Sequence, residues 1–219
     1  MYPSRLWTPQ EVILWSKDNL KSYFPPGQGF HYSDTGYHLL GLIAEKITGN
    51  PLYQIYEEYF FKPLGMDHSH MVHYSEPLVQ SEYPVADIYV DTVVLNNYRS
   101  LSIEFAGGGI ISTSDDLLKF MKALVSNEII SAESFEQMKV WSKFAMGIDY
   151  GYGLVRFRTI PLLMPPKYNI WGNFGSTGSF LFYQPDIDLY LIGTFNQFRT
   201  TQKAIRFMLK TIDIVSKMK

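Results

Sequence analysis

The sequence predicts an α+β fold in which helices come first and a mostly antiparallel sheet, closed by a last helix, comes second. Two observations lead to this prediction. Up to about residue 149, apolar residues recur at helical intervals in segments bounded by capping residues, proline and glycine. From Tyr150 onward the pattern changes to short apolar runs separated by prolines and glycines, which is typical of strands. Helices followed by a strand meander favour an antiparallel sheet with helices packed on it.

The helical part contains five predicted helices, most of them with a recognisable start signal. The clearest signal is the capping box Thr8-Pro9-Gln10-Glu11, with proline at the first helical position. Asp34 is predicted to be the N-cap of the second helix, and Gly49 its left-handed C-cap. The predicted helices are 9–21, 35–48, 51–61, 115–125 and 131–139. Residues 66–106 are predicted to form long loops with short strands, and Gly107-Gly108-Gly109 a flexible stretch of backbone.

The helix at 35–48 carries an apolar stripe, from which one face is predicted to belong to the core. The stripe consists of Leu39, Leu40, Ile43, Ala44 and Ile47. A packed helix of this kind would hold the preceding loop, with Tyr32 and Asp34, in a fixed position.

The second part is predicted to contain four strands and a C-terminal helix with an amphipathic pattern. The strands are expected at 152–158, 167–172, 178–184 and 188–196, and the helix at 200–217. With 219 residues and 46% apolar content, the chain can bury one good core. We therefore expect a single domain over 1–219, with a mainly helical part at 1–149 and the strands and last helix at 150–219.

Composition excludes several classes of function. A net charge of −2 gives no general field for nucleic acid or anionic lipid. The absence of cysteine rules out disulfides, thiolate metal sites and a cysteine nucleophile. No segment is apolar over the roughly 18 residues that a membrane span needs, and the first 30 residues show no signal-peptide core. The compartment stays open.

Several segments, in one order along the chain, resemble the serine β-lactamase and penicillin-binding protein-like family. The resemblance is closest to its class C-like branch, which includes D-alanyl-D-alanine carboxypeptidases, D-amino-acid peptidases and esterases. The matching segments are Tyr32-Ser33-Asp34 through Gly49, FKPLGM at 61–66, GGGIISTSDDLLKFMKAL at 107–124, YGYGL at 150–154 and GNFGSTGSFLFYQPDIDLYLIGTFNQ at 172–197. The resemblance implies a β-lactamase/transpeptidase-like fold and serine acyl-transfer hydrolysis without a cofactor.

The resemblance also implies which residues form the site. In the family, the tyrosine at position 32 helps the serine to lose its proton and passes a proton to the leaving group. Asp34 adds a negative charge that would oppose ionisation of this tyrosine. The third motif, Lys/His-Thr/Ser-Gly in the family, falls on Asn173-Phe174-Gly175 here, and the N–H of Ser176 would form half of an oxyanion hole.

The family nucleophile lies in a Ser-x-x-Lys motif ahead of the tyrosine motif, and no such motif precedes Tyr32. We therefore expect a truncated domain, without the N-terminal strands and the nucleophile helix, that is inactive as given. Ser216 and Lys219 match the motif in letters but lie at a frayed helix end. Three alternatives remain open: a non-catalytic module that binds peptides or small cell-wall fragments, a structural remnant, and a half-enzyme completed by another chain.

Three further expectations concern contacts. Tyr32, Asp34 and Asn173 should lie within about 10 Å of one another, the reach of one small ligand. The segment 188–196 would present an uncovered sheet edge, through which the chain could form a homodimer. His68, His70 and His73 could hold a transition metal, but a histidine-rich loop is more often solvated surface, so no metal site is predicted.

Overall fold

The structure, a computed structural model, describes residues 3–162 and 164–218, which fold into two compact units. The first unit consists of Met1–Pro84 and Leu95–Phe120, and the second of Val85–Val94 and Met121–Lys219. Residues 121–149, expected with the helical part, thus lie in the unit that contains the main sheet. The expectation of a single domain over residues 1–219 stays a prediction.

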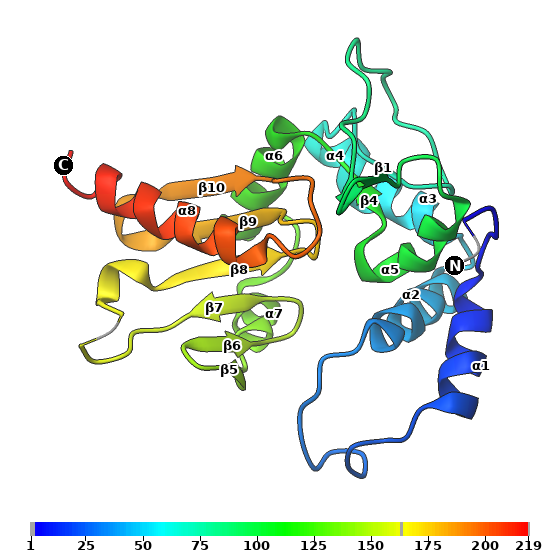
Figure 1. Ribbon diagram of the computed structural model, residues 1–219, viewed down its shortest axis with the longest axis horizontal. Helices are drawn as coiled ribbons and strands as arrows, with labels where there is room; N and C mark the ends of the chain where they lie inside the picture. The colour runs from blue at the N-terminus through cyan, green and yellow to red at the C-terminus, as the bar shows by residue number, and fades with distance from the viewer. Residues whose placement is uncertain (1–2, 163, 219) are drawn as a thin grey trace. The chain divides into compact units, whose positions relative to one another are not determined.

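The first unit is mainly helical, as the sequence predicts (Figure 1). Short strands β1 (His70–Met71) and β4 (Ile110–Ile111) pair antiparallel in it. Its helices are α1 (Pro9–Asn19), α2 (Asp34–Thr48), α3 (Leu52–Tyr56), the π-helical η1 (Glu57–Phe61), α4 (Lys62–Leu64), the 3₁₀ helix η2 (Arg99–Glu104), α5 (Phe105–Gly108) and the first part of α6 (Ser114–Val125). Gly107 and Gly108, predicted to be flexible backbone, form the end of α5 instead.

Local start and stop signals account for the ends of the first two helices. The backbone N–H of Thr8 donates to Glu11 Oε2 at 2.8 Å, and the Glu11 N–H donates to Thr8 Oγ1 at 3.2 Å, so the predicted capping box is confirmed. Gly49 ends α2 with a φ of 76°, in the left-handed region that favours glycine. The prediction for the start of α2 was wrong by one residue, because the N-cap is Ser33 and Asp34 is already helical.

The prediction that the apolar stripe of α2 belongs to the core was wrong. Leu39, Leu40, Ile43 and Ile47 are between 47% and 79% exposed. The buried residues of α2 are His38 and Gly41 instead. A Cβ on Gly41 would lie 2.7 Å from Phe105 Cε1 and 2.8 Å from the Cβ of Ala106, so the missing side chain lets α2 approach α5 closely. The helix therefore packs through its small residue, and its large apolar residues face outward.

The core of the first unit lies between α2, α3, α5 and β1. Its buried residues are Leu52, Ile55, Met71 and Phe105. The side chains of Leu42 and Ala44 pack partly against this cluster. Of the predicted stripe, only Ala44 therefore contributes to the core.

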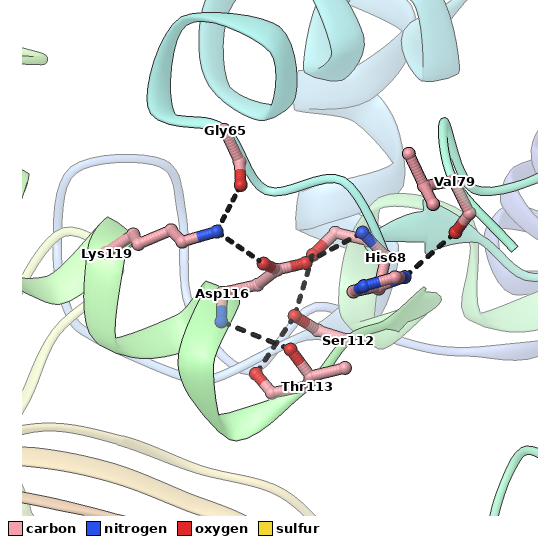
Figure 2. Close-up of polar contacts among 8 residues, drawn as sticks. Gly65, His68, Val79, Ser112, Thr113, Asp116 and Lys119 are labelled. Carbon is pink, nitrogen blue, oxygen red and sulfur yellow. Dashed lines mark hydrogen bonds and ion pairs between the residues drawn. The ribbon is translucent and has the colours of Figure 1, made fainter. Parts of the chain in front are cut away.

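A buried carboxylate joins the loop after α4 to the start of α6 (Figure 2). Asp116 Oδ2 accepts hydrogen bonds from the His68 N–H at 3.0 Å and from the Ser69 hydroxyl at 2.9 Å. Lys119 Nζ lies 3.2 Å from Asp116 Oδ1 and also donates to the Gly65 carbonyl. The N–H of Asp116 donates to Thr113 Oγ1, so Thr113 caps α6, whereas Ser112 or Ser114 had been expected to do so. Asp116 thereby ties two segments that are far apart in the sequence.

The main sheet of the second unit is antiparallel, with the order β10-β9-β8-β7-β6-β5 among the described residues (Figure 1). The four predicted strands are confirmed, each shorter than predicted, and β8 ends at Phe174 rather than at residue 172. The strands are β5 (Ser142–Ala145), β6 (Ile148–Tyr150), β7 (Val155–Phe157), β8 (Ile170–Phe174), β9 (Phe180–Gln184) and β10 (Leu189–Gly193). Strands β5 and β6 were not predicted, because segments of three or four residues are too short to show a period of two. A hairpin of β2 (Tyr89–Val90) and β3 (Val93–Val94) also belongs to this unit.

Helix α8 (Thr201–Val215) covers one face of the sheet (Figure 1). Its Ala204, Met208 and Ile212 are fully buried, and Phe207 contacts Phe180 of β9 with ring centroids 6.0 Å apart. The remaining helices of this unit are α7 (Ala132–Met138) and the 3₁₀ turns η3 (Pro166–Tyr168) and η4 (Pro185–Ile187). Ser216 caps α8, whereas Lys219 lies outside the described residues. In the described part of the chain, no helix combines the length and the apolar character needed to cross a bilayer.

Candidate active site

Tyr32 and Asp34 form a hydrogen-bonded pair at the start of α2. The Tyr32 hydroxyl donates to Asp34 Oδ1 at 2.7 Å. Helix α2 fixes Asp34 at its first position, where a negative charge is favoured by the helix dipole. Tyr32 is half-buried and its ring also contacts Tyr37, with centroids 6.0 Å apart. The phenol is therefore held in place by the loop, by the helix end and by one carboxylate.

This environment strongly favours the neutral form of Tyr32. Burial raises the pKa of the Tyr32 phenol most, and the hydrogen bond to Asp34 and the charge of Asp34 raise it further. The opposition between Asp34 and ionisation of Tyr32, expected from the sequence, is thus confirmed. A phenol in this state can accept or donate a hydrogen bond, but it cannot act as a phenolate base at neutral pH.

A second carboxyl group, which sequence reasoning did not single out, lies close to this pair. Burial raises the pKa of Glu104, and the negative charge of Asp34 raises it further. Glu104 ends η2, just before α5, and its Oε2 would be 3.2 Å from a Cβ placed on Gly108. The sequence analysis placed Glu104 in the predicted loops of residues 66–106, just before the glycines 107–109 that were predicted to be flexible. The carboxyl group directly before the glycines was the signal that could have revealed it.

His38 is the other residue that the sequence did not reveal. It is 2% exposed, and within the described residues its Nδ1 has no hydrogen-bond partner. Its Cε1 would be 3.5 Å, and Asp34 Oδ1 3.8 Å, from a Cβ on Gly107, so both residues border this glycine. Burial lowers the pKa of His38, although a hydrogen bond with the Ile103 backbone and the charge of Asp34 act in the opposite direction. His38 follows Asp34 by one helical turn, which is the pattern that could have identified it.

Asn173, Gly175 and Ser176, the predicted substrate-binding residues, lie at the end of β8 and in the turn that leads to β9. Asn173 Nδ2 donates to the Gly153 carbonyl at 3.2 Å, and Asn173 Oδ1 accepts from the Phe174 N–H at 2.8 Å. Its amide therefore braces the local backbone. The Gly175 N–H donates to the Ser179 carbonyl at 2.9 Å. Among the described residues, the N–H of exposed Ser176 has no such partner and can donate to a ligand.

The predicted site residues divide between the two units. Tyr32 and Asp34 belong to the first unit, whereas Asn173, Gly175 and Ser176 belong to the second. In the first unit, Tyr32 and Asp34 are hydrogen-bonded to each other. In the second unit, Asn173 lies in β8, and Gly175 and Ser176 follow this strand directly. The expectation that Tyr32, Asp34 and Asn173 lie within about 10 Å of one another stays a prediction.

The histidines of the 68–73 segment are engaged with the backbone. His68 Nδ1 lies 2.8 Å from the Val79 carbonyl oxygen, and His73 Nε2 lies 3.1 Å from the Tyr98 carbonyl oxygen. Burial lowers the pKa of His70. Within residues 3–162 and 164–218, no group of three or more histidine, cysteine, aspartate or glutamate residues is placed to hold a metal ion.

Comparison with known proteins places this arrangement in context. The family model described as Beta-lactamase matches residues 16–210. Penicillin-binding protein 4* of Bacillus subtilis (strain 168) is 30% identical over 160 residues, which are 67% of this chain and 36% of that protein. The mitochondrial serine beta-lactamase-like protein LACTB of Homo sapiens is 36% identical over 120 residues, 53% of this chain and 21% of LACTB. The match thus spans little more than a third of penicillin-binding protein 4* and about a fifth of LACTB.

Solved structures show the same arrangement of elements over nearly the whole chain. D-stereospecific amidohydrolase from Streptomyces sp. has a TM-score of 0.76 and 25% identity, covering 93% of this chain and 61% of that one. D-amino acid amidase from Ochrobactrum anthropi SV3 has a TM-score of 0.78 and 23% identity, covering 99% of this chain and 67% of that one. About a third of each of these solved chains therefore has no counterpart among the 219 residues.

Proposed function

The chain belongs to the Beta-lactamase family, whose members include penicillin-binding protein-like serine hydrolases, and we propose that by itself it binds peptide-like acyl donors without hydrolysing them. The single observation that carries the proposal is the Tyr32–Asp34 pair. This pair retains the family's tyrosine motif in a fixed geometry but holds the phenol in its neutral form.

Acyl transfer in this family needs a group that the 219 residues do not supply at the expected place. A serine oxygen attacks the carbonyl carbon, its proton passes to a base, and the leaving group departs with a proton; water then releases the acyl group. No Ser-x-x-Lys motif lies ahead of Tyr32 in this sequence. A neutral Tyr32 alone cannot replace both the nucleophile and its base.

The remaining groups are suited to binding. Asp34 Oδ1 accepts the hydrogen bond of the Tyr32 hydroxyl, and the second oxygen of Asp34 can accept hydrogen bonds from N–H groups of a ligand. The free N–H of Ser176 can donate to a ligand carbonyl. A peptide or amino-acid amide carries both kinds of group, so each unit by itself offers it one kind of contact. The name of the D-stereospecific amidohydrolase supports amides and peptides of D-amino acids as the class to test first.

Backbone NMR titration of the labelled chain tests the proposal. With an acetylated peptide that ends in D-alanyl-D-alanine, we expect saturable shifts at residues 32–34 and 175–177, and no product above the buffer control. Asp34→Ala should weaken binding, whereas Asp115→Ala, an exposed change on α6, should not. Hydrolysis of the peptide, or shifts that ignore both segments, would contradict the proposal.

A second candidate, a half-enzyme completed by another polypeptide, is favoured by the outward face of α1 and α2. Leu14 and Trp15 of α1 are 58% and 55% exposed, and Leu40 and Ile47 of α2 are 60% and 79% exposed. Exposed apolar residues on two helices that contact each other favour a surface that another segment covers.

Co-expression tests this second candidate. The partner should be the part of penicillin-binding protein 4* that has no counterpart in this chain. The half-enzyme account expects a stable complex that turns over a p-nitrophenyl ester, and expects Ile47→Asp to prevent its assembly. The candidate is rejected if the two polypeptides purify separately, or if the complex is inactive.

A further inference from the structure

The turn that carries Ser176 directs the N–H of this residue outward. The Gly178 N–H donates to the Gly175 carbonyl at 3.1 Å, so residues 175–178 form a β-turn in which Ser176 and Thr177 are the two central residues. In a planar trans peptide, the C=O and the N–H point in opposite directions. Because the Gly175 carbonyl points into the β-turn, the Ser176 N–H of the same peptide points away from it.

A neighbouring loop, residues 194–200, holds this turn in place. The Gln197 N–H donates to the Thr177 carbonyl at 3.0 Å. A Cβ on Gly178 would lie 2.2 Å from Thr200 Oγ1, so the turn approaches the loop too closely for a side chain at this position. The direction of the outward N–H therefore depends on the position of the loop.

The β2–β3 hairpin holds the other side of the loop. The Tyr89 N–H donates to the Asn196 carbonyl at 2.8 Å, and the Phe198 N–H donates to the Tyr89 carbonyl at 2.9 Å. These two bonds flank Gln197 as in a parallel sheet, so the Gln197 N–H points to the opposite side, toward the turn. The Gln197 side chain adds a hydrogen bond of 3.4 Å to the carbonyl of Asp91, which lies 106 residues earlier in the chain.

We propose that the β2–β3 hairpin, acting through Gln197, positions the Ser176 N–H to donate to the carbonyl group of a ligand. Tyr89 and Gln197 are positioning residues, since they act on the ligand only through the turn. A donor that is already held in one direction binds an acceptor more tightly than a mobile donor does, because binding then orders fewer groups. This role rests on the proposed function, which assigns the Ser176 N–H to a ligand. The contacts involved all join residues of the second unit.

Amide hydrogen exchange tests whether the hairpin holds the turn. Tyr89→Pro removes the N–H that donates to the loop. We expect the amide protons of Gln197 and Gly178 to exchange faster in this variant, by about tenfold or more, because their hydrogen bonds open more often. Val94→Ala, an exposed change in the same hairpin, should leave both rates unchanged. Unchanged rates in Tyr89→Pro would overturn the proposal.

A disulfide provides a second variant, which keeps the test decisive if Tyr89→Pro does not fold. The chain has no cysteine of its own, and Tyr89 and Gln197 are Cα partners across the bridge. Neighbouring strands lie about 4.7–4.9 Å apart, within the Cα separation that a disulfide spans. Tyr89→Cys/Gln197→Cys should therefore cross-link, and the Gly178 amide proton should exchange more slowly in the oxidised form than in the reduced form. Failure to cross-link, or equal rates in both forms, would overturn the proposal.

Ligand titration connects the hairpin to binding. With the acetylated peptide that ends in D-alanyl-D-alanine, Tyr89→Pro should lose most of the shift of the Ser176 amide and bind about tenfold more weakly, the effect of one hydrogen bond. The shifts at residues 32–34 should persist, whereas a general loss of folding would remove both sets.

The same titration separates the two proposals. If Tyr89→Pro keeps the shifts at residues 175–177 and the affinity of the unmodified chain, the positioning role alone is refuted. If the unmodified chain shows no saturable shifts, the proposed function is refuted as well.

Discussion

At the scale of single residues, the Tyr32–Asp34 pair shows how burial and a neighbouring carboxylate determine the chemistry of a phenol. Burial raises the pKa of Tyr32 most, and Asp34, which accepts the hydrogen bond of the phenol, raises it further. The sequence alone indicated the effect of Asp34 on this pKa, because Asp34 adds a negative charge beside the phenol. The contributions of burial and of Glu104 needed coordinates, since they depend on which distant segment covers the loop.

Replacing Asp34 by asparagine should lower the pKa of Tyr32, because the change removes a negative charge and replaces a carboxylate acceptor with a weaker amide oxygen. Tyrosine ring carbon signals followed by NMR in alkaline titration would measure this. In the original chain Tyr32 should still be protonated at about pH 10, where exposed tyrosines titrate. Asp87→Asn is the matched control, since Asp87 accepts the hydroxyl of Tyr89 in the same way. An unchanged Tyr32 pKa in Asp34→Asn would refute the assigned cause.

His38 should make the free energy of unfolding depend on pH. Because burial lowers the pKa of His38 in the folded state, the unfolded chain takes up the proton first as pH falls. Stability is then retained above the ordinary histidine pKa of about 6.5 and is lost as pH falls below it. Urea midpoints measured at several pH values should show a smaller loss in His38→Gln, with a part left because His70 shifts in the same direction. A loss of equal size in both chains would argue against this role for His38.

At the scale of elements, the buried Asp116 holds the start of α6 against the loop after α4 (Figure 2). Asp116→Ala leaves the His68 N–H and the Ser69 hydroxyl without their acceptor, and we expect it to cost about 3 kcal/mol of unfolding free energy. Asp115→Ala, on the exposed side of the same turn, should change stability by less than about 0.5 kcal/mol. Urea unfolding of both variants decides this. Two variants of equal stability would show that the network contributes little.

The contact between α2 and α5 depends on the missing side chain of Gly41. An added Cβ would approach the Ala106 Cβ to 2.8 Å, so Gly41→Ala should destabilise the first unit by about 1–3 kcal/mol. Gly36→Ala in the same helix meets no atom closer than 4.0 Å and should be neutral or stabilise by up to about 1 kcal/mol. Thermal unfolding compares the two. If Gly41→Ala proves as stable as Gly36→Ala, the close approach is not required.

The elements were predictable where the determinants are local. The capping box of α1, the left-handed Gly49 and the amphipathic α8 all follow from residues within one or two turns. The apolar stripe of α2 misled the prediction, because periodicity shows which face is apolar but not which partner covers it. Gly41 determined the packed face, and its importance became visible only against Phe105 and Ala106.

At the scale of the whole molecule, the chain has the β-lactamase/transpeptidase fold. Most of its residues match relatives that are themselves longer, by about a half or more. Fold class and family could be predicted because several segments matched in one order. The substrate could not be predicted, because it depends on surfaces that local patterns do not describe, and the homodimer expected through the segment 188–196 stays a prediction. The function that we propose for a chain with this fold is binding without hydrolysis.

Intact-mass spectrometry after incubation with a β-lactam or an activated ester tests that claim most directly. These reagents leave an acyl group on a competent serine, and removing the catalytic residues of such a unit leaves only a small part of the rate enhancement. We predict an unchanged mass for the 219-residue chain over hours. A stoichiometric acyl adduct on any serine would contradict the account, and it would direct attention first to Ser176, in the turn after β8.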